Sequence, residues 1–253
     1  MCGRYSLFAP PDEIERRFDA TFAYEFEPRY NAAPRQELPV ITDERAGAIQ
    51  ALEWGLVPSW AEDRTEYGFI NARAETLDEK PSFRGAFERS ESSGNGEPGE
   101  RTGGRCLVLA DGFYEWVETS GGKQPYRVTI DGGEPFAMAG LWERWRPPQR
   151  QTGLGEFGTE TENGGNDEPV VETFTIVTTE PNDVVAELHH RMGVILPADE
   201  RQRWLDGTPA DAQELLEPIP GERMEATRVS QTVNDPSNDD PSVLQSAKGD
   251  AGQ

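Results

Sequence analysis

Residues 105–117, RCLVLADGFYEWV, contain two short runs of the apolar and aromatic residues that favour β-strands. Residues 105–110 are predicted to form a buried strand because Arg105 is followed by the continuous apolar run 106–110, and residues 112–117 follow after a single Asp111. Similar runs predict strands elsewhere in the chain, at residues 38–42, 48–54, 125–130, 136–142, 173–179, 194–196 and 224–230.

Helical patterns are fewer and shorter than the strand patterns. Pairs of apolar residues four apart, behind a proline, predict helices at residues 12–18 and 81–89. Comparable start signals predict helices at residues 181–188, 198–205 and 210–216. Because helices do not alternate regularly with strands, a doubly wound α/β fold is disfavoured. We predict an α+β protein: a single domain with a curved, mainly antiparallel, barrel-like β-sheet core flanked by short helices.

Two internal segments and the C-terminal tail lack hydrophobic periodicity. Residues 89–104 and 146–169 are rich in Gly, Pro, Ser and acidic residues, so we expect them to be exposed, mobile insertions. Residues 246–253 have the same character and are expected to form a disordered tail. The predicted domain therefore spans residues 1–245.

The composition is strongly acidic. The chain has 253 residues, with 24 Lys and Arg against 47 Asp and Glu, and its formal net charge is −23. This surplus suits a protein that stays soluble in a salty cytoplasm, although an acidic mesophilic protein could share it. It argues against non-specific nucleic-acid binding, which neutralises phosphates, but it leaves room for a local basic cleft. Without a long apolar run or a secretory signal, we expect a cytoplasmic protein that does not bind membranes.

The two cysteines differ in their positions along the chain. Cys106 lies in a predicted buried strand and is expected to be a small core residue. Removal of Met1 would make Cys2 the N-terminal residue, with an α-amine of pKa about 7.7–8.0 beside a thiol of pKa about 8.5. An amine and a thiol on adjacent carbons can close a thiazolidine ring on an aldehyde. The thiol could instead serve as a nucleophile in amide hydrolysis, or Cys2 could simply begin a strand.

Several motifs resemble those of the SOS-response-associated peptidase (SRAP) family and follow one another in the family's order along most of the chain. Members of this family shield abasic sites in single-stranded DNA by bonding to them covalently through the N-terminal cysteine. The family name records an older proposal of peptidase activity. The motifs are MCGRY (1–5), RYNAAP (29–34), WGLVPSW (54–60), NARAE (71–75), ADGFYEW (110–116), LHHRM (188–192) and VSQTVN (229–234).

The resemblance implies a catalytic set of Cys2, Asn71, Glu115 and His189. Cys2 supplies the amine and the thiol that trap the C1′ aldehyde of an open abasic sugar. Asn71 can hydrogen-bond the amine or a sugar hydroxyl, although an Asn before Ala72 could equally cap a turn.

Glu115 lies in an aromatic run. If residues 112–117 form a strand, Glu115 shares one face with Phe113, while Tyr114 and Trp116 take the other. Partial burial beside Phe113 should raise the pKa of Glu115, which suits a proton shuttle between the sugar oxygen and the amine. The alternative is a solvated strand residue.

His189 and His190 are the two histidines of the chain, and they follow the predicted helix at 181–188. Neighbours at a helix end cannot both face one site. Because the family motif places its active-site histidine first, we assign His189 to acid/base work or to a sugar or phosphate contact, and expect His190 at the surface or at a cap. The Cys and His spacings match no metal motif, so neither a metal nor another cofactor is expected.

Arginine and tryptophan side chains supply the candidate DNA contacts. Arginine suits phosphate oxygens and tryptophan suits base stacking, for which Trp60 is a better candidate than the more core-like Trp54. Arg73 would point the same way as Asn71 on an extended segment, unless it pairs with Glu75. The predicted DNA-binding residues are Arg4, Arg29, Asn31, Trp60, Arg73, Arg191 and Asn234.

We therefore predict a monomeric sensor of abasic sites in single-stranded DNA, which crosslinks them as a thiazolidine through Cys2 and joins the nucleoid during DNA damage. Met1 would be removed autocatalytically or by an aminopeptidase, and the imine chemistry implies an associated β-elimination activity. The alternatives are a thiol peptidase that cleaves other proteins and a non-covalent module that recognises a modified base. The last alternative predicts that Cys2→Ala leaves all activity intact.

Overall fold

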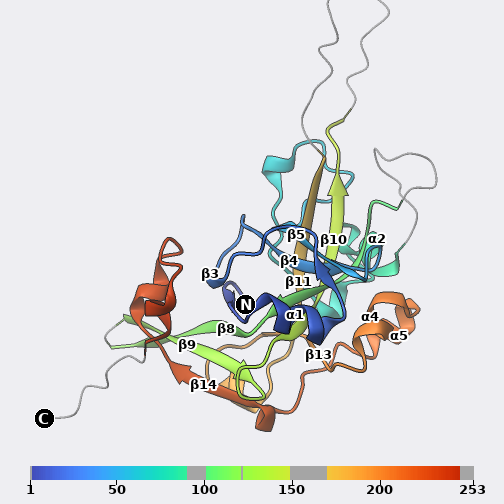
Figure 1. The fold of residues 1–253 in the computed structure, drawn as a ribbon. Helices are drawn as coiled ribbons and strands as arrows, with labels where there is room; N and C mark the ends of the chain where they lie inside the picture. Colours follow the sequence, from blue (N-terminus) through green and yellow to red (C-terminus); the bar gives the residue numbers. More distant parts are fainter. Residues whose placement is uncertain (1, 90–100, 121, 149–169, 246–253) are drawn as a thin grey trace, which may run out of the picture.

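The computed structural model describes residues 2–89, 101–120, 122–148 and 170–245 (Figure 1). Its core is a closed five-stranded barrel, which confirms the predicted α+β fold with a barrel-like, mainly antiparallel sheet. Neighbouring strands of the ring pair antiparallel, except that β11 closes the ring on β5 in parallel. In ring order the strands are β5 (Ala48–Trp54), β4 (Glu37–Thr42), β7 (Gly103–Ala110), β10 (Phe136–Trp145) and β11 (Val171–Thr179).

The barrel closes between two strands that lie far apart in the sequence. Thr173 of β11 pairs with Glu53 of β5, and Phe174 pairs with Trp54. The rings of Trp54 and Phe174 are both fully buried and lie stacked, with centroids 6.3 Å apart. Aromatic packing therefore supports the closing pair.

A second sheet carries the start of the chain beside the barrel (Figure 1). Its strands all pair antiparallel. Tyr5 of β1 lies opposite Phe113 of β8, and this pairing brings Cys2 close to the strand that carries Glu115. In order across the sheet the strands are β14 (Met224–Arg228), β9 (Gly122–Ile130), β8 (Gly112–Thr119), β1 (Tyr5–Leu7) and β3 (Arg29–Ala32).

Short strands extend the barrel wall. β6 pairs in parallel with β11 and sets Asn71 opposite Ile176. Because β6 is extended and Ala72 between them is buried, Asn71 and Arg73 share the more open face, as predicted. The short strands are β2 (Thr21–Phe22), β6 (Asn71–Arg73), β12 (Met192–Gly193) and β13 (Ile195–Leu196).

The helices are short, and all but α4 begin at a proline or a side-chain cap; α4 begins at Arg201, three residues later than predicted, without a side-chain cap. Prolines open α1 and α2, the Asn182 side chain caps α3, and Thr208 forms a capping box at α5. α3 ends at Ala186, two residues earlier than predicted. The α-helices are α1 (Pro11–Phe18), α2 (Pro81–Glu88), α3 (Asp183–Ala186), α4 (Arg201–Asp206) and α5 (Pro209–Gln213). The 3₁₀ turns are η1 (Arg64–Glu66), η2 (Ala74–Thr76), η3 (Gly221–Arg223), η4 (Gln231–Asn234) and η5 (Pro241–Leu244).

Both faces of β7 are buried, which explains its continuous apolar run. Cys106 and Val108 pack in the cluster that also contains Cys2, whereas Leu107 and Leu109 pack in a second cluster with the aromatic residues of α2. Cys106 is a fully buried free cysteine, so its predicted place in the core is confirmed. Burial of each Val or Leu side chain of β7 contributes about 1.5–3 kcal/mol of hydrophobic stabilisation.

The predicted insertions and tail fall mostly outside the described residues, which exclude 90–100, 149–169 and 246–253. The predicted insertion at 89–104 runs too far, because Gly103 and Gly104 belong to β7 and pair with β10. Among the described residues, no helix is long and apolar enough to cross a membrane.

Candidate active site around Cys2

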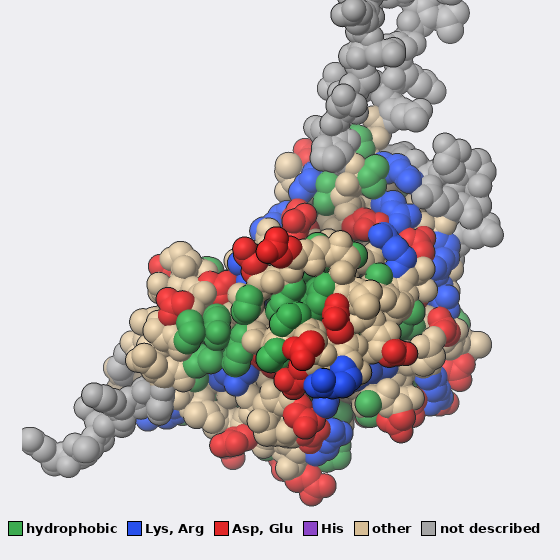
Figure 2. Space-filling model, in the orientation of Figure 1, with side chains coloured by type: hydrophobic (Ala, Val, Ile, Leu, Met, Phe, Trp, Pro, Cys, Tyr) green, Lys and Arg blue, Asp and Glu red, His purple; other side chains and the backbone are tan. Residues whose placement is uncertain are grey.

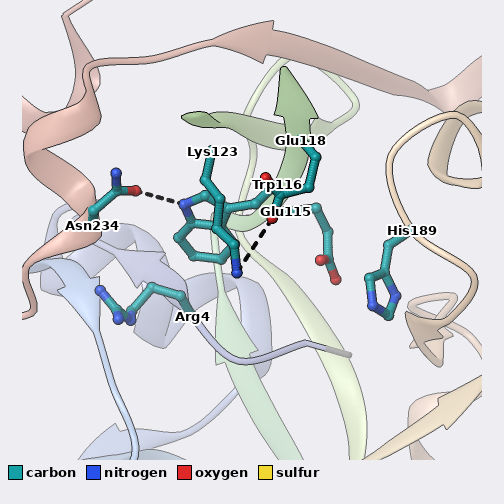
Figure 3. Close-up of a pocket in the computed structure, with 7 residues that line it drawn as sticks. All are labelled: Arg4, Glu115, Trp116, Glu118, Lys123, His189 and Asn234. Carbon is teal, nitrogen blue, oxygen red and sulfur yellow. Dashed lines mark hydrogen bonds and ion pairs between the residues drawn. The ribbon is translucent and has the colours of Figure 1, made fainter. Parts of the chain in front are cut away.

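A pocket of about 500 Å³ opens beside the start of the chain. Figure 3 shows the carboxylate of Glu115 and the imidazole of His189 side by side, across the pocket from Arg4 and Asn234. The lining side chains come from the N-terminal segment, β8, β9, the turn after α3 and η4. They are Arg4, Glu115, Trp116, Glu118, Lys123, His189 and Asn234.

Cys2 does not line this pocket; it is fully buried in the cluster that contains Tyr5 and Trp54. Burial raises the pKa of the Cys2 thiol to about 12, and the nearby Glu115 carboxylate acts in the same direction. The thiol is therefore protonated at neutral pH. Since the thiolate is the nucleophile, reaction at Cys2 requires a base that takes this proton.

Asn71 fixes the backbone at Cys2. Its Nδ2 donates a hydrogen bond of 3.0 Å to the Cys2 carbonyl oxygen. Within the described part of the chain its Oδ1 is buried and has no hydrogen-bond partner. A buried acceptor left unpaired costs about 1–3 kcal/mol, so this oxygen is ready for a donor such as an amine or a sugar hydroxyl.

Glu115 is the acidic side chain that acts electrostatically on the Cys2 thiol. It is 2% exposed, and burial raises its pKa to about 7. The predicted desolvation of this carboxyl group is therefore confirmed. A carboxyl group with a pKa near 7 can both accept and return a proton at neutral pH, which is what a proton shuttle requires.

The two histidines lie in a turn that follows α3, which corrects the prediction that they end a helix. Their rings pack against each other with centroids 4.3 Å apart, because α3 already ends at Ala186 and the turn brings them together. Nδ1 of His189 lies 3.1 Å from both the backbone nitrogen and the carbonyl oxygen of Arg191, which anchors the ring. Only His189 of the pair lines the pocket, and burial lowers its pKa, so it is mainly neutral at pH 7.

Arg4 and Trp116 form the opposite wall. The Arg4 guanidinium lies over the Trp116 ring at 5.9 Å from its centroid, and Trp116 Nε1 donates 2.7 Å to Asn234 Oδ1. The predicted pattern placed Trp116 on the strand face opposite Glu115, yet both side chains line this pocket. One feature of the sequence could have placed Trp116 in the site: it directly follows Glu115 at the end of the aromatic run.

Asn31 supports this wall from behind. Its Oδ1 accepts from Arg4 Nη1 at 2.8 Å, and its Nδ2 donates to carbonyl oxygens of Val233, Asp235 and Asn238. The side chain is fully buried. Asn31 was predicted to contact DNA, but in this structure it braces Arg4 against the C-terminal segment and does not face the pocket.

Comparisons with known proteins relate nearly the whole chain to one family. Residues 1–236 match the family described as SOS response associated peptidase (SRAP). The chain belongs to this family. It is 37% identical over 255 residues to abasic site processing protein YoqW of Bacillus subtilis (strain 168), covering 97% of this chain and 100% of that protein.

Two further relatives extend the SRAP comparison. Abasic site processing protein HMCES of Gallus gallus is 31% identical over 252 residues, covering 87% of this chain and 66% of that protein. A crystal structure of a protein from Bacteroides thetaiotaomicron superposes with a TM-score of 0.76 at 27% identity, covering 97% of this chain and 100% of that chain. The fold is therefore shared with that protein along nearly the whole chain.

Two of the remaining motif arginines that were predicted to bind DNA are already paired with acidic side chains. Arg29 forms an ion pair of 3.2 Å with Asp239. Arg191 binds both oxygens of Glu75, at 2.5 and 2.9 Å, and this holds the pKa of Glu75 below its usual value. Glu75 therefore pairs with Arg191, and Arg73 stays exposed at the end of β6.

The two tryptophans of WGLVPSW differ as predicted. Trp54 is fully buried, whereas Trp60 is 43% exposed and meets the ring of Tyr67 edge-on, with centroids 5.4 Å apart. Trp60 does not line the pocket beside Cys2. Its DNA contact stays a prediction.

The face of the molecule in the orientation of Figure 1 carries charged side chains of both signs and an apolar patch (Figure 2). Figure 2 shows acidic side chains across the face of Figure 1, with hydrophobic side chains gathered near its centre. Among the described residues, no group of three or more His, Cys, Asp and Glu side chains could hold a metal ion.

Proposed function

We propose that this SRAP protein captures abasic sites in single-stranded DNA as a covalent thiazolidine at Cys2. One observation carries the proposal: Glu115, which lines the pocket with His189, acts electrostatically on the buried Cys2 thiol, and Asn71 hydrogen-bonds the Cys2 carbonyl oxygen. The names of the relatives, which are abasic site processing proteins, support it.

The chemistry requires that Met1 be removed so that Cys2 has a free amine. The amine adds to the C1′ aldehyde of the open abasic sugar and releases one water as the imine forms. The Cys2 sulfur then bonds to the imine carbon, its proton passes to the ring nitrogen, and the five-membered ring is complete. No oxidant or other reactant is needed.

Glu115 is the proposed proton carrier. Because the pKa of the Cys2 thiol is raised to about 12, very little thiolate is present at neutral pH. Glu115, with a pKa of about 7, can accept the thiol proton as the carbon–sulfur bond forms and return it to nitrogen. The neutral His189 ring and Asn71 Oδ1 would hold the sugar oxygens.

The DNA strand would enter across the wall opposite Glu115. The Trp116 ring offers a face for a base beside the abasic sugar, and Arg4 and the exposed Arg73 offer cations for phosphates. We propose that the protein acts as a monomer on single-stranded DNA in the cytoplasm, near the nucleoid when DNA is damaged. Any β-elimination would start from the same imine.

Intact-mass analysis after incubation with an abasic single-stranded oligonucleotide tests the proposal. We expect a product that weighs the sum of both partners minus one water. The matched control is Cys106→Ala, which removes the other buried thiol and should crosslink normally, whereas Cys2→Ala should not crosslink. An equal adduct from Cys2→Ala would refute the proposal and favour a different nucleophile.

A further inference from the structure

Glu143 is a second buried carboxylate, and it lies outside the pocket beside Cys2. It belongs to β10, is 4% exposed, and burial raises its pKa to about 7. The carboxylate accepts a short hydrogen bond from the backbone nitrogen of Ser59. A Cβ at Gly103 would come within 2.8 Å of Glu143 Cγ, so glycine there leaves room for this side chain.

The segment that Glu143 holds, residues 57–61, is fastened to the barrel by side chains along its length. Val57 donates its backbone nitrogen to Thr173 Oγ1 at 2.9 Å, and Trp145 Nε1 donates 2.8 Å to the Ala61 carbonyl oxygen. The Thr102 hydroxyl reaches the Ser59 hydroxyl at 3.1 Å. These bonds hold the backbone on both sides of Trp60.

Trp60 is the exposed residue of this fastened segment. Its ring packs edge-on against Tyr67, which leaves a face of the indole towards solvent. From Tyr67 the chain runs to Asn71, a span of at most about 14 Å when fully extended. A DNA strand held at Asn71 would therefore reach Trp60 within a few nucleotides.

A buried carboxylate is a costly means of holding a loop. Removing a charged group from water is unfavourable unless its partners compensate, and a buried carboxylate in an otherwise apolar wall often adds no net stability. The backbone amide of Ser59 gains a carboxyl oxygen as acceptor, which an apolar side chain cannot supply. The benefit lies in fixing one position of the loop.

We infer that Glu143 is a positioning residue for DNA: through the Ser59 amide it fixes residues 57–61 so that Trp60 presents its indole to a nucleobase of the bound strand. The strand's path past Asn71 rests on the proposed function. Stacking on Trp60 does not depend on the chemistry of Cys2. It can therefore be measured separately, through the binding of a DNA strand that has no abasic site.

The experiment measures binding of an intact single-stranded oligonucleotide and capture of an abasic one by the full chain. The variants are Glu143→Gln, which keeps an oxygen acceptor, Glu143→Met, which loses it, and Trp60→Ala. We expect Trp60→Ala and Glu143→Met each to weaken binding by roughly 5- to 100-fold, the value of one stacked base. Glu143→Gln should bind within about twofold of the parent protein, and the double variant should be no weaker than Trp60→Ala.

In the capture assay, the half-saturating DNA concentration should rise in Glu143→Met, while the limiting rate stays unchanged. A merely structural role would lower the limiting rate as well. If Glu143→Met does not fold, Thr102→Val loosens Ser59 from the other side and should also weaken binding. Unaltered binding in Trp60→Ala, or equal losses in Glu143→Gln and Glu143→Met, would overturn the inference. Failure of the parent protein to capture abasic DNA, with these binding effects intact, would instead refute only the proposed function.

Discussion

Glu115 and Glu143 are two buried glutamates with nearly the same burial and very different surroundings. Each is at most 4% exposed, and burial raises the pKa of each to about 7. Glu115 lines an open pocket with His189 beside the Cys2 thiol, whereas the carboxylate of Glu143 binds the backbone of Ser59 inside the wall. A perturbed pKa therefore does not distinguish a reactive group from a positioning group, whereas open volume and a nearby nucleophile do.

The largest expected effect separates these two glutamates. Glu115→Gln should slow thiazolidine formation by about 100- to 10,000-fold, since it removes the proton carrier but keeps shape and hydrogen bonding. Glu143→Gln, the matched change, should leave the limiting rate near that of the parent protein. Single-turnover kinetics at saturating abasic DNA measure both rates.

The pH profile sharpens the same contrast. Because Glu115 must be ionised to accept the thiol proton, the limiting rate should rise as pH increases through about 7 and then level off. Glu115→Gln should lose this inflection and Glu143→Gln should keep it. An inflection that persists in Glu115→Gln would show that another group carries the proton.

A smaller loss is expected at Asn71. Asn71→Ala removes the hydrogen bond to the Cys2 carbonyl oxygen and the unpaired buried acceptor, so the Cys2 amine would be less well placed. Misplacement of a reacting group by about 1 Å costs up to about 100-fold in rate. Gel analysis of crosslinking reactions stopped at successive times measures this loss. An unchanged rate in a folded Asn71→Ala variant would show that Asn71 has no role in the reaction.

Stability should depend on pH through Glu143. Its pKa is raised by folding, so the folded state holds a proton that the unfolded chain has already lost between pH about 4.5 and 7. This stabilisation is fully present below the lower value and is lost as pH rises through the higher one. Glu143→Gln cannot ionise, so its Tm relative to the parent protein should increase by several degrees from pH 5.5 to 8.

Differential scanning calorimetry at several pH values measures this difference. The ion-paired acids with lowered pKa values, such as Glu75 and Asp131, are already ionised across this range and should add little slope. A Tm difference that does not change with pH would show that Glu143 stays neutral, or stays charged at little cost.

The smallest effect is expected from salt. With a net charge of −23 and with Arg29 and Arg191 already paired to acids, phosphate contacts contribute little to holding DNA. Screening removes most of what remains at molar salt, while stacking and the covalent bond persist. Final adduct yield should change less than about twofold from 0.2 to 3 M salt. Loss of adduct at a few hundred millimolar, with circular dichroism unchanged, would show that electrostatic capture governs the yield.

The sequence was sufficient for the barrel strands and insufficient for the contacts that close the barrel. Apolar runs such as residues 106–110 predicted buried strands, because their hydrophobic pattern is local. β1, β3 and β6 were missed as strands, since they are short and their polar residues give no alternation. The parallel pairing of β5 with β11 joins distant segments and has no local signal.

In the site too, the features that depend on local sequence were predicted and a contact between distant segments was not. Resemblance supplied Cys2, Asn71 and His189, and the aromatic run beside Glu115 correctly predicted its raised pKa. The partner of Glu75 depends on β6 and β12 both pairing with β11, which no spacing in the sequence indicates.

Location of the DNA on the chain tests the central claim most directly. The pocket holds a rival amine, Lys123, which lies 3.7 Å from Glu118 and could form a reversible imine. After reaction with abasic DNA and nuclease trimming, trypsin should release Cys2-Gly3-Arg4 from the mature chain. Peptide mass spectrometry should find the sugar remnant on this tripeptide, without any added reductant. A remnant on the Lys123 peptide, or one seen only after borohydride reduction, would contradict thiazolidine capture by Cys2.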